Sequence, residues 1–150
     1  MAVQRRAHAT WEGDLRSGSG RFDLESSGTI HGQEVSFSSR FGDEAGGKTS
    51  PEELIAAAHA TCLSMALANG LAQQGHPPTR LETEAVCTLD QTDAGFRITS
   101  MQLSVRGQVD GIDEAEFQAA AAEAKAGCPV SNALAGDVEI TLEASLEGSG

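Results

Sequence analysis

The sequence is poor in cysteine, and the few cysteines it has do not form a familiar structural set. Its 150 residues include three of them, Cys62, Cys87 and Cys128. An odd and sparse set is not the disulfide framework of a small secreted protein. No two of them have the CxxC spacing, so a structural zinc site has no support from this pattern. In a reducing compartment, distant cysteines are either incidental or redox-active.

Basic residues and long hydrophobic segments are also scarce. The chain has 10 Lys and Arg against 22 Asp and Glu, a formal net charge of −12. This balance argues against binding to nucleic acid or to an anionic membrane surface, because both need basic residues. No uninterrupted apolar run approaches the roughly 20 residues that span a membrane. Residues 1–14 contain no apolar signal core, so we expect a cytoplasmic protein.

The length of the chain fits one domain, 1–150, with a core of ordinary size. Alternation of apolar and polar residues predicts strands at 6–14, 21–27, 34–41, 80–90, 95–109 and 137–147. In the third strand, Arg40 is expected near the end and on the face opposite Phe37.

A different periodicity predicts helices at 51–74, 113–126 and 129–135. In the first, Ser50 is the expected N-cap, Glu53 completes a capping box, and Gly75 ends the helix. From Leu54 to Leu71 this helix is apolar almost all round, which is typical of a helix buried on every side. A chain of this size has little material to cover it, so we expect a second subunit to do so. The order of elements predicts an α+β fold with antiparallel sheets.

Two of the cysteines are candidates for chemistry. Cys62 lies mid-helix, where it is either a small buried side chain or a nucleophile that needs a cation from elsewhere. Arg40 is the best candidate for that cation because its strand ends shortly before the helix. Cys128 precedes Pro129 and so takes an N-cap position, where backbone N–H groups favour a thiolate. The alternative is that Cys128 only turns the chain between two helices.

Glu52 and His59 each allow more than one interpretation. Glu52 either stabilises the helix dipole or anchors Arg40 through a bidentate ion pair. His59, one turn before Cys62, is either a core histidine or the partner of Cys62 in a hydrolase or in a metal site with His76. Cys87 is expected in the core of a strand.

Two motifs surround the cysteines, TSPEELIAAAHATCLSMAL (49–67) and AKAGCPVSNAL (124–134). At this separation they resemble the osmotically induced protein C (OsmC) family, the sister of the organic hydroperoxide resistance (Ohr) proteins. The resemblance continues in ATWEGD (9–14), SRFGDE (39–44) and LDQTDAGFRIT (89–99), and so covers nearly the whole chain.

The resemblance implies an OsmC-like α+β fold, with antiparallel sheets wrapped around a long central helix in an intertwined homodimer. It places an active site at the subunit interface. In that site Cys62 matches the peroxidatic cysteine and Cys128 the resolving cysteine. Arg40 matches the arginine of the OsmC branch, and Glu52 matches the glutamate that orients this arginine.

The reaction implied by the resemblance is reduction of an organic hydroperoxide. Cys62 becomes a sulfenic acid, Cys128 condenses with it to a disulfide, and an external dithiol, of lipoyl type, reduces the disulfide. No cofactor, metal, haem or flavin takes part. The open alternative is a non-enzymatic stress protein of the same fold, whose cysteines serve packing alone.

Overall fold

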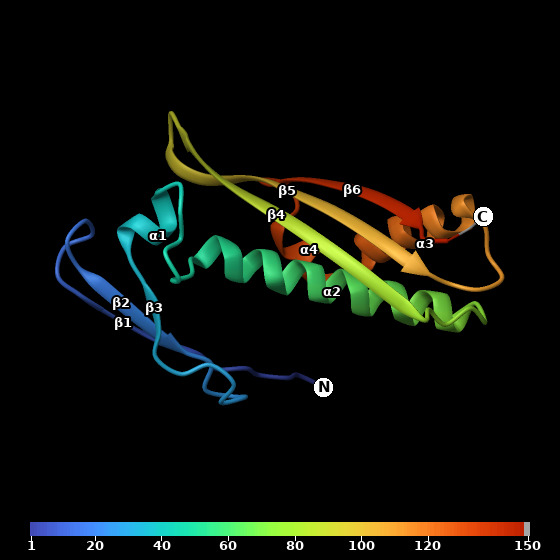
Figure 1. The fold of residues 1–150 in the computed structure, drawn as a ribbon, viewed down its shortest axis with the longest axis horizontal. Coiled ribbons are helices and arrows are strands. Elements are labelled where there is room, and N and C mark those ends of the chain that lie inside the picture. The colour runs from blue at the N-terminus through green and yellow to red at the C-terminus, as the bar shows by residue number, and fades with distance from the viewer. Residues whose placement is uncertain (149–150) are drawn as a thin grey trace. The chain divides into compact units, whose positions relative to one another are not determined.

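The computed structural model describes residues 1–148, and Figure 1 shows the course of the chain. Its contacts divide the chain into two compact units, Met1–Leu54 and Ile55–Gly150. Each unit has a three-stranded sheet of its own. The last two residues of the expected domain 1–150 lie outside the described residues.

The first unit contains a small antiparallel sheet in the order β1-β2-β3. Its strands are β1 (His8–Glu12), β2 (Ser19–Asp23) and β3 (Gln33–Val35). Thr10 pairs with Arg21, and Arg21 pairs in turn with Glu34. These strands fall within or close to the predicted ones, but each is shorter.

The prediction of one strand over 34–41 is wrong in its second half. The strand β3 ends at Val35, and Phe37–Phe41 form a short helix, α1. Ser36 caps this helix: its hydroxyl accepts from the Ser39 N–H at 3.2 Å, and its own N–H donates to the Ser39 hydroxyl at 2.9 Å. Such reciprocal capping starts a helix even where the sequence alternates. Arg40 therefore lies in the last turn of α1 and not on a strand face.

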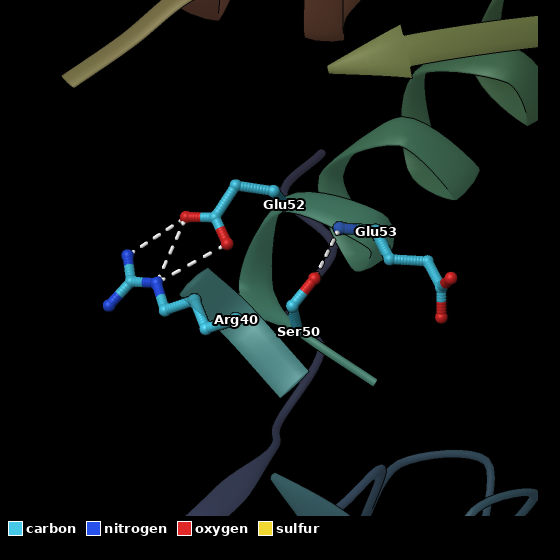
Figure 2. A network of polar contacts seen from close by, with 4 residues as sticks. All are labelled: Arg40, Ser50, Glu52 and Glu53. Carbon is cyan, nitrogen blue, oxygen red and sulfur yellow. Dashed lines mark hydrogen bonds and ion pairs between the residues drawn. The ribbon is translucent and has the colours of Figure 1, made fainter. Parts of the chain in front are cut away.

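The long helix α2 (Pro51–Gln73) follows the predicted bounds closely. The Ser50 hydroxyl accepts from the Glu53 N–H at 3.2 Å, as Figure 2 shows. The Glu53 carboxylate accepts from the Thr49 hydroxyl at 2.5 Å instead of from the Ser50 N–H, so only half of the expected capping box forms. At the other end, Gly75 has a φ of 86°. Glycine adopts this left-handed conformation at little energetic cost, and the helix ends there as predicted.

The second unit contains the sheet β4-β5-β6. Its strands are β4 (Arg80–Thr92), β5 (Gly95–Gln108) and β6 (Glu139–Leu146), with the helices α3 (Glu114–Gly127) and α4 (Pro129–Leu134) between β5 and β6. The strands β4 and β5 form the expected antiparallel hairpin, but β6 runs parallel to β5. The prediction of purely antiparallel sheets is therefore wrong here. The two intervening helices carry the chain back along the sheet, as a parallel neighbour requires.

The core of the second unit is built from one face each of α2, β5 and α3. Every fourth residue of α2 is fully buried, which gives the stripe His59, Leu63, Leu67 and Leu71. On β5, alternate residues point inward, namely Met101, Leu103 and Val105. Phe117 and three alanines of α3 complete this core cluster.

The opposite face of α2 is open in the single chain. Met65 has 69% of its surface exposed. Only 22% of the most apolar 18-residue window of α2 is buried, and that window has a mean hydropathy of 1.5.

By length and composition alone, α2 could cross a membrane, so the expectation that the chain holds no such segment is wrong. Single polar residues interrupt the apolar run, but the mean hydropathy of the 18-residue window remains high enough for a membrane span. A buried core helix meets the same criteria.

Substitution of Gly107 by alanine tests the packing of β5 against α3. A Cβ at this position would lie 2.5 and 2.6 Å from two ring carbons of Phe117, which is fully buried. We expect Gly107→Ala to lower the free energy of unfolding by about 1–3 kcal/mol, because the ring cannot move without disturbing the core. Urea denaturation measures this change. The control is Gly127→Ala, where the added Cβ meets no atom within 4 Å; an equal loss there would contradict this packing argument.

Candidate active site

Cys62 and Cys128 lie in direct contact within the second unit. Their Sγ atoms are 3.0 Å apart, although 66 positions separate them in the sequence. Cys62 comes from the middle of α2, and Cys128 is the N-cap of α4, with Pro129 at the first helical position. Cys128 is fully buried, and Cys62 is partly exposed. A disulfide needs a sulfur separation of about 2.05 Å, so a shift of about 1 Å is enough to form the bond.

The two thiols have different electrostatic surroundings. Burial raises the pKa of Cys62, and the hydrogen bond with Cys128 raises it further. Burial also acts to raise the pKa of Cys128, but hydrogen bonding from Cys62, Ser131 and Val130 outweighs it, and the net direction is downward. The Cys128 side chain forms no N-cap hydrogen bond of the standard kind. The backbone N–H groups of Val130 and Ser131, at the start of α4, are nevertheless among the groups that lower its pKa.

A second polar pair lies beside the thiols in the core. His59 Nε2 and Ser131 Oγ are 2.7 Å apart. His59 is fully buried, and Ser131 is 5% exposed. Burial lowers the pKa of His59, so the imidazole is neutral near neutral pH. The expected core histidine is thus present, but its Nδ1 has no hydrogen-bond partner among residues 1–148.

Arg40 and Glu52 form an ion pair in the first unit. Arg40 Nη2 donates to Glu52 Oε1 at 2.8 Å, and Arg40 Nε lies 3.2 and 3.3 Å from the two carboxylate oxygens, as Figure 2 shows. Glu52 is 7% exposed, which limits its contact with water. The Arg40 guanidinium also lies 5.2 Å from the centre of the Phe41 ring. This geometry fixes the orientation of the Arg40 guanidinium against the Glu52 carboxylate.

The four predicted site residues therefore form two pairs. The structure brings Cys62 to Cys128 in one unit and Arg40 to Glu52 in the other. Cys87 lies on β4 and packs against the core, as expected.

The metal and hydrolase interpretations gain no geometric support. Over residues 1–148, no group of three His, Cys, Asp or Glu side chains could hold a metal ion. His76 is engaged elsewhere, since its Nδ1 lies 3.2 Å from the Asp110 carbonyl oxygen. His59 directs Nε2 to Ser131, so it is not the base of a Cys62–His59 pair.

Sequence reasoning did not find Ser131. Two signals were available. Ser131 follows Cys128 by three residues, the spacing of an N-cap and its N3 partner. His59 occupies the same i, i+4 stripe as Leu63, so it had to be buried with a polar partner from another element.

Comparison with known proteins gives consistent matches. The profile of the family described as "OsmC-like protein" matches residues 42–143. The chain is 45% identical over 147 residues to "Peroxiredoxin OsmC" of Escherichia coli (strain K12), which covers 98% of this chain and 99% of that protein. It is 33% identical over 97 residues to "Organic hydroperoxide resistance protein OhrA" of Bacillus subtilis (strain 168), which covers 63% of this chain and 66% of that one.

Solved structures show the same fold. The crystal structure of the organic hydroperoxide resistance protein OhrB of Bacillus subtilis matches with a TM-score of 0.73 and 25% identity, over 93% of this chain and 98% of that one. An organic hydroperoxide resistance protein from Elizabethkingia anophelis matches with a TM-score of 0.77 and 23% identity, over 98% and 100% of the two chains. The OsmC-like α+β fold predicted from the sequence is thereby confirmed.

Mild oxidation tests the geometry of the thiol pair. Because the two Sγ atoms are 3.0 Å apart, we expect a diamide-type oxidant to join Cys62 to Cys128 within one chain and to leave Cys87 reduced. Peptide mapping by mass spectrometry under non-reducing conditions identifies the linked peptides. A Cys87→Ala variant should form the same bond at the same rate. A product that contains Cys87, or that joins two chains, would contradict the observed contact.

Proposed function

Because the chain belongs to the family of OsmC-like proteins, we propose that it is a thiol-dependent peroxidase that reduces organic hydroperoxides to alcohols through Cys62 and Cys128. The observation that carries the proposal is the 3.0 Å contact between the two sulfurs, one of which is fully buried. The names of the relatives, a peroxiredoxin and organic hydroperoxide resistance proteins, support a peroxidase role.

In the first step, the Cys62 thiolate attacks the distal oxygen of R–O–O–H. The O–O bond breaks, the sulfur becomes a sulfenic acid, and the departing alkoxide takes a proton to become the alcohol. Burial raises the pKa of Cys62, so this step needs a cation that favours the thiolate. We assign that role to Arg40, which can also stabilise the charge that develops on the leaving oxygen. Glu52 holds the guanidinium in place through the ion pair.

In the second step, the Cys128 thiolate attacks the sulfur of the Cys62 sulfenic acid. The S–S bond forms, the S–O bond breaks, and the hydroxide that leaves is protonated to water. An external dithiol, for which we propose the lipoyl type, then reduces the disulfide by two successive exchanges. The intramolecular contact makes this resolution fast, because the sulfurs need not diffuse together.

The substrate is expected to be an alkyl or aryl hydroperoxide in preference to hydrogen peroxide. Near Cys62, α2 has an open apolar face that includes Met65, one turn along the helix. Each CH₂ of a substrate that such a surface removes from water contributes about 0.8 kcal/mol to binding.

We also propose that the protein works as a cytoplasmic homodimer and that residues 1–150 act as one functional domain. The open apolar face of α2 supports the dimer, since a large exposed apolar surface calls for a covering partner. The excess of acidic residues and the sparse cysteines support a reducing, cytoplasmic setting.

Cysteine variants test the assigned roles. We expect Cys62→Ser to lose hydroperoxide turnover entirely, because serine is not nucleophilic without an adjacent base. We expect Cys128→Ser to consume about one equivalent of hydroperoxide and then to stop, because Cys62 remains a sulfenic acid. Consumption of cumene hydroperoxide in the presence of dihydrolipoamide measures both.

Cys87→Ser serves as the control for these variants and should keep wild-type turnover. Wild-type activity in Cys62→Ser would exclude Cys62 as the peroxidatic cysteine. Absence of hydroperoxide turnover in the wild-type protein would leave the non-enzymatic stress protein of the same fold as the better description.

The ion pair has a separate test. Arg40→Lys keeps the charge but loses the planar fork that binds both carboxylate oxygens, and Glu52→Gln keeps the shape but loses the anchoring charge. We expect either change to lower kcat/KM by about tenfold or more, since misplaced donors stabilise the transition state poorly. Arg106→Lys, which alters an exposed pair with Glu82, is the matched control. An unchanged kcat/KM in both site variants would remove Arg40 and Glu52 from the mechanism.

A further inference from the structure

Two neighbouring contacts join α2 to the segment that contains α4. The first is the thiol pair, Cys62 and Cys128, and the second is the imidazole–hydroxyl pair, His59 and Ser131. On each side the two residues are three positions apart, which is about one helical turn. Cys128, Ser131 and His59 are all at least nine-tenths buried. A polar pair therefore stands directly beside the reacting sulfurs in a region that water reaches poorly.

The position of the proton on His59 follows from its surroundings. The ring is neutral and therefore has a single N–H. Its Nδ1 is buried and has no partner among residues 1–148. Orphaned buried N–H groups are rarer in proteins than under-satisfied acceptors, so Nδ1 is the bare nitrogen. Nε2 and Ser131 Oγ are 2.7 Å apart, and with the proton on Nε2 this nitrogen is the donor of that hydrogen bond.

This arrangement fixes the direction of the Ser131 hydroxyl. Its oxygen is already an acceptor for His59, so its own hydrogen is available to another acceptor. Ser131 is at position N3 of α4, and Cys128 is its N-cap. Residues three positions apart lie about one helical turn from each other, so Ser131 is close to Cys128 along the chain. The Ser131 side chain accordingly acts on the Cys128 sulfur as a donor that favours the thiolate.

We propose that Ser131, held by His59, is a positioning residue that presents Cys128 as a thiolate, both when Cys128 attacks Cys62 and when it leaves. The proposal rests on the peroxidase function above. The chain of donors runs from His59 Nε2–H to Ser131 Oγ, and from the Ser131 hydroxyl to the Cys128 sulfur. These donors act on the resolving cysteine, Cys128, whereas Arg40 is assigned to the peroxidatic cysteine, Cys62.

The same hydroxyl acts in two chemical steps. In resolution, it stabilises the Cys128 thiolate before that sulfur attacks the Cys62 sulfenic acid and displaces hydroxide. In reduction, a thiolate of the dithiol attacks the Cys62 sulfur, the S–S bond breaks, and the electron pair leaves on Cys128. A more stable leaving thiolate departs faster. The second thiol of the reductant then attacks the mixed disulfide on Cys62 and releases Cys62 as a thiolate.

The decisive variant is Ser131→Ala. One equivalent of cumene hydroperoxide is added without reductant, and samples are quenched over time with a sulfenic-acid probe and read by mass spectrometry. We expect Cys62 to be oxidised at the wild-type rate. We expect the disulfide to form about tenfold more slowly near neutral pH, because loss of a hydrogen bond to the thiolate raises the pKa of Cys128. The pH midpoint of disulfide formation should rise accordingly, with Cys62 the other titratable side chain that acts on Cys128.

Matched variants separate positioning from structural damage. Ser64→Ala removes a partly buried hydroxyl on α2, whereas Ser131 lies on α4. The Ser64 hydroxyl donates to the Ala60 carbonyl at 2.8 Å and contacts Thr83. This variant should leave the midpoint unchanged. Ser131→Ala leaves His59 with both nitrogens unpaired, so the double variant with His59→Leu guards against loss of the fold, since apolar replacement of both partners is nearly neutral. It should show the same slow resolution. His59→Gln retains an N–H donor and should resolve faster than His59→Leu.

The outcomes distinguish this proposal from the function beneath it. Wild-type protein whose Cys62 is not oxidised at all would overturn the peroxidase function and this proposal with it. Normal oxidation of Cys62 together with a wild-type rate and midpoint of disulfide formation in Ser131→Ala would overturn the proposal alone. A midpoint shift of equal size in Ser64→Ala would also overturn it, because the effect would then be structural.

Discussion

Packing of α2 against β5 and α3 is the interaction on which the thiol chemistry depends. The buried stripe of His59, Leu63, Leu67 and Leu71 fixes the rotation of α2 about its axis. Each buried leucine contributes about 1.5–3 kcal/mol, far more than a contact between two thiols can supply. The 3.0 Å approach of Cys62 to Cys128 is therefore a consequence of the core and not its cause.

The same burial makes two identical side chains chemically different. Cys62 loses hydration and gains no net compensation within the second unit, so burial raises its pKa. Cys128 is more deeply buried but lies at the start of a helix, where Ser131 and the backbone N–H groups offset the loss. A poorly hydrated site strengthens each of these contacts, because the surroundings screen charge weakly. Position in the fold, and not residue type, divides the proposed roles of nucleophile and resolving thiol.

Local signals in the sequence were sufficient for most elements and failed where two signals competed. Periodicity and capping residues gave α2, α3 and the β4–β5 hairpin closely. In 34–41, alternation favoured a strand, but the Ser36–Ser39 capping box gave a helix and moved Arg40 to its last turn. The strand β6 was found, yet its parallel pairing with β5 was not, because direction depends on the path of two intervening helices. Alternation alone carries no information on strand direction.

The sequence by itself determined the residue types of the candidate site and the helical positions of Cys62 and Cys128, because these follow from local spacing. It left the ion pair of Glu52 with Arg40 as one of two interpretations of Glu52, which the resemblance to the OsmC family favoured. It also indicated that α2 needs more apolar cover than one chain provides. Only the tertiary structure brought Cys62 to Cys128 and His59 to Ser131 across more than 60 positions. Contacts at that separation depend on how the core orients whole helices. No local periodicity encodes that orientation, and for this reason the contact of Ser131 with His59 was seen only in the fold.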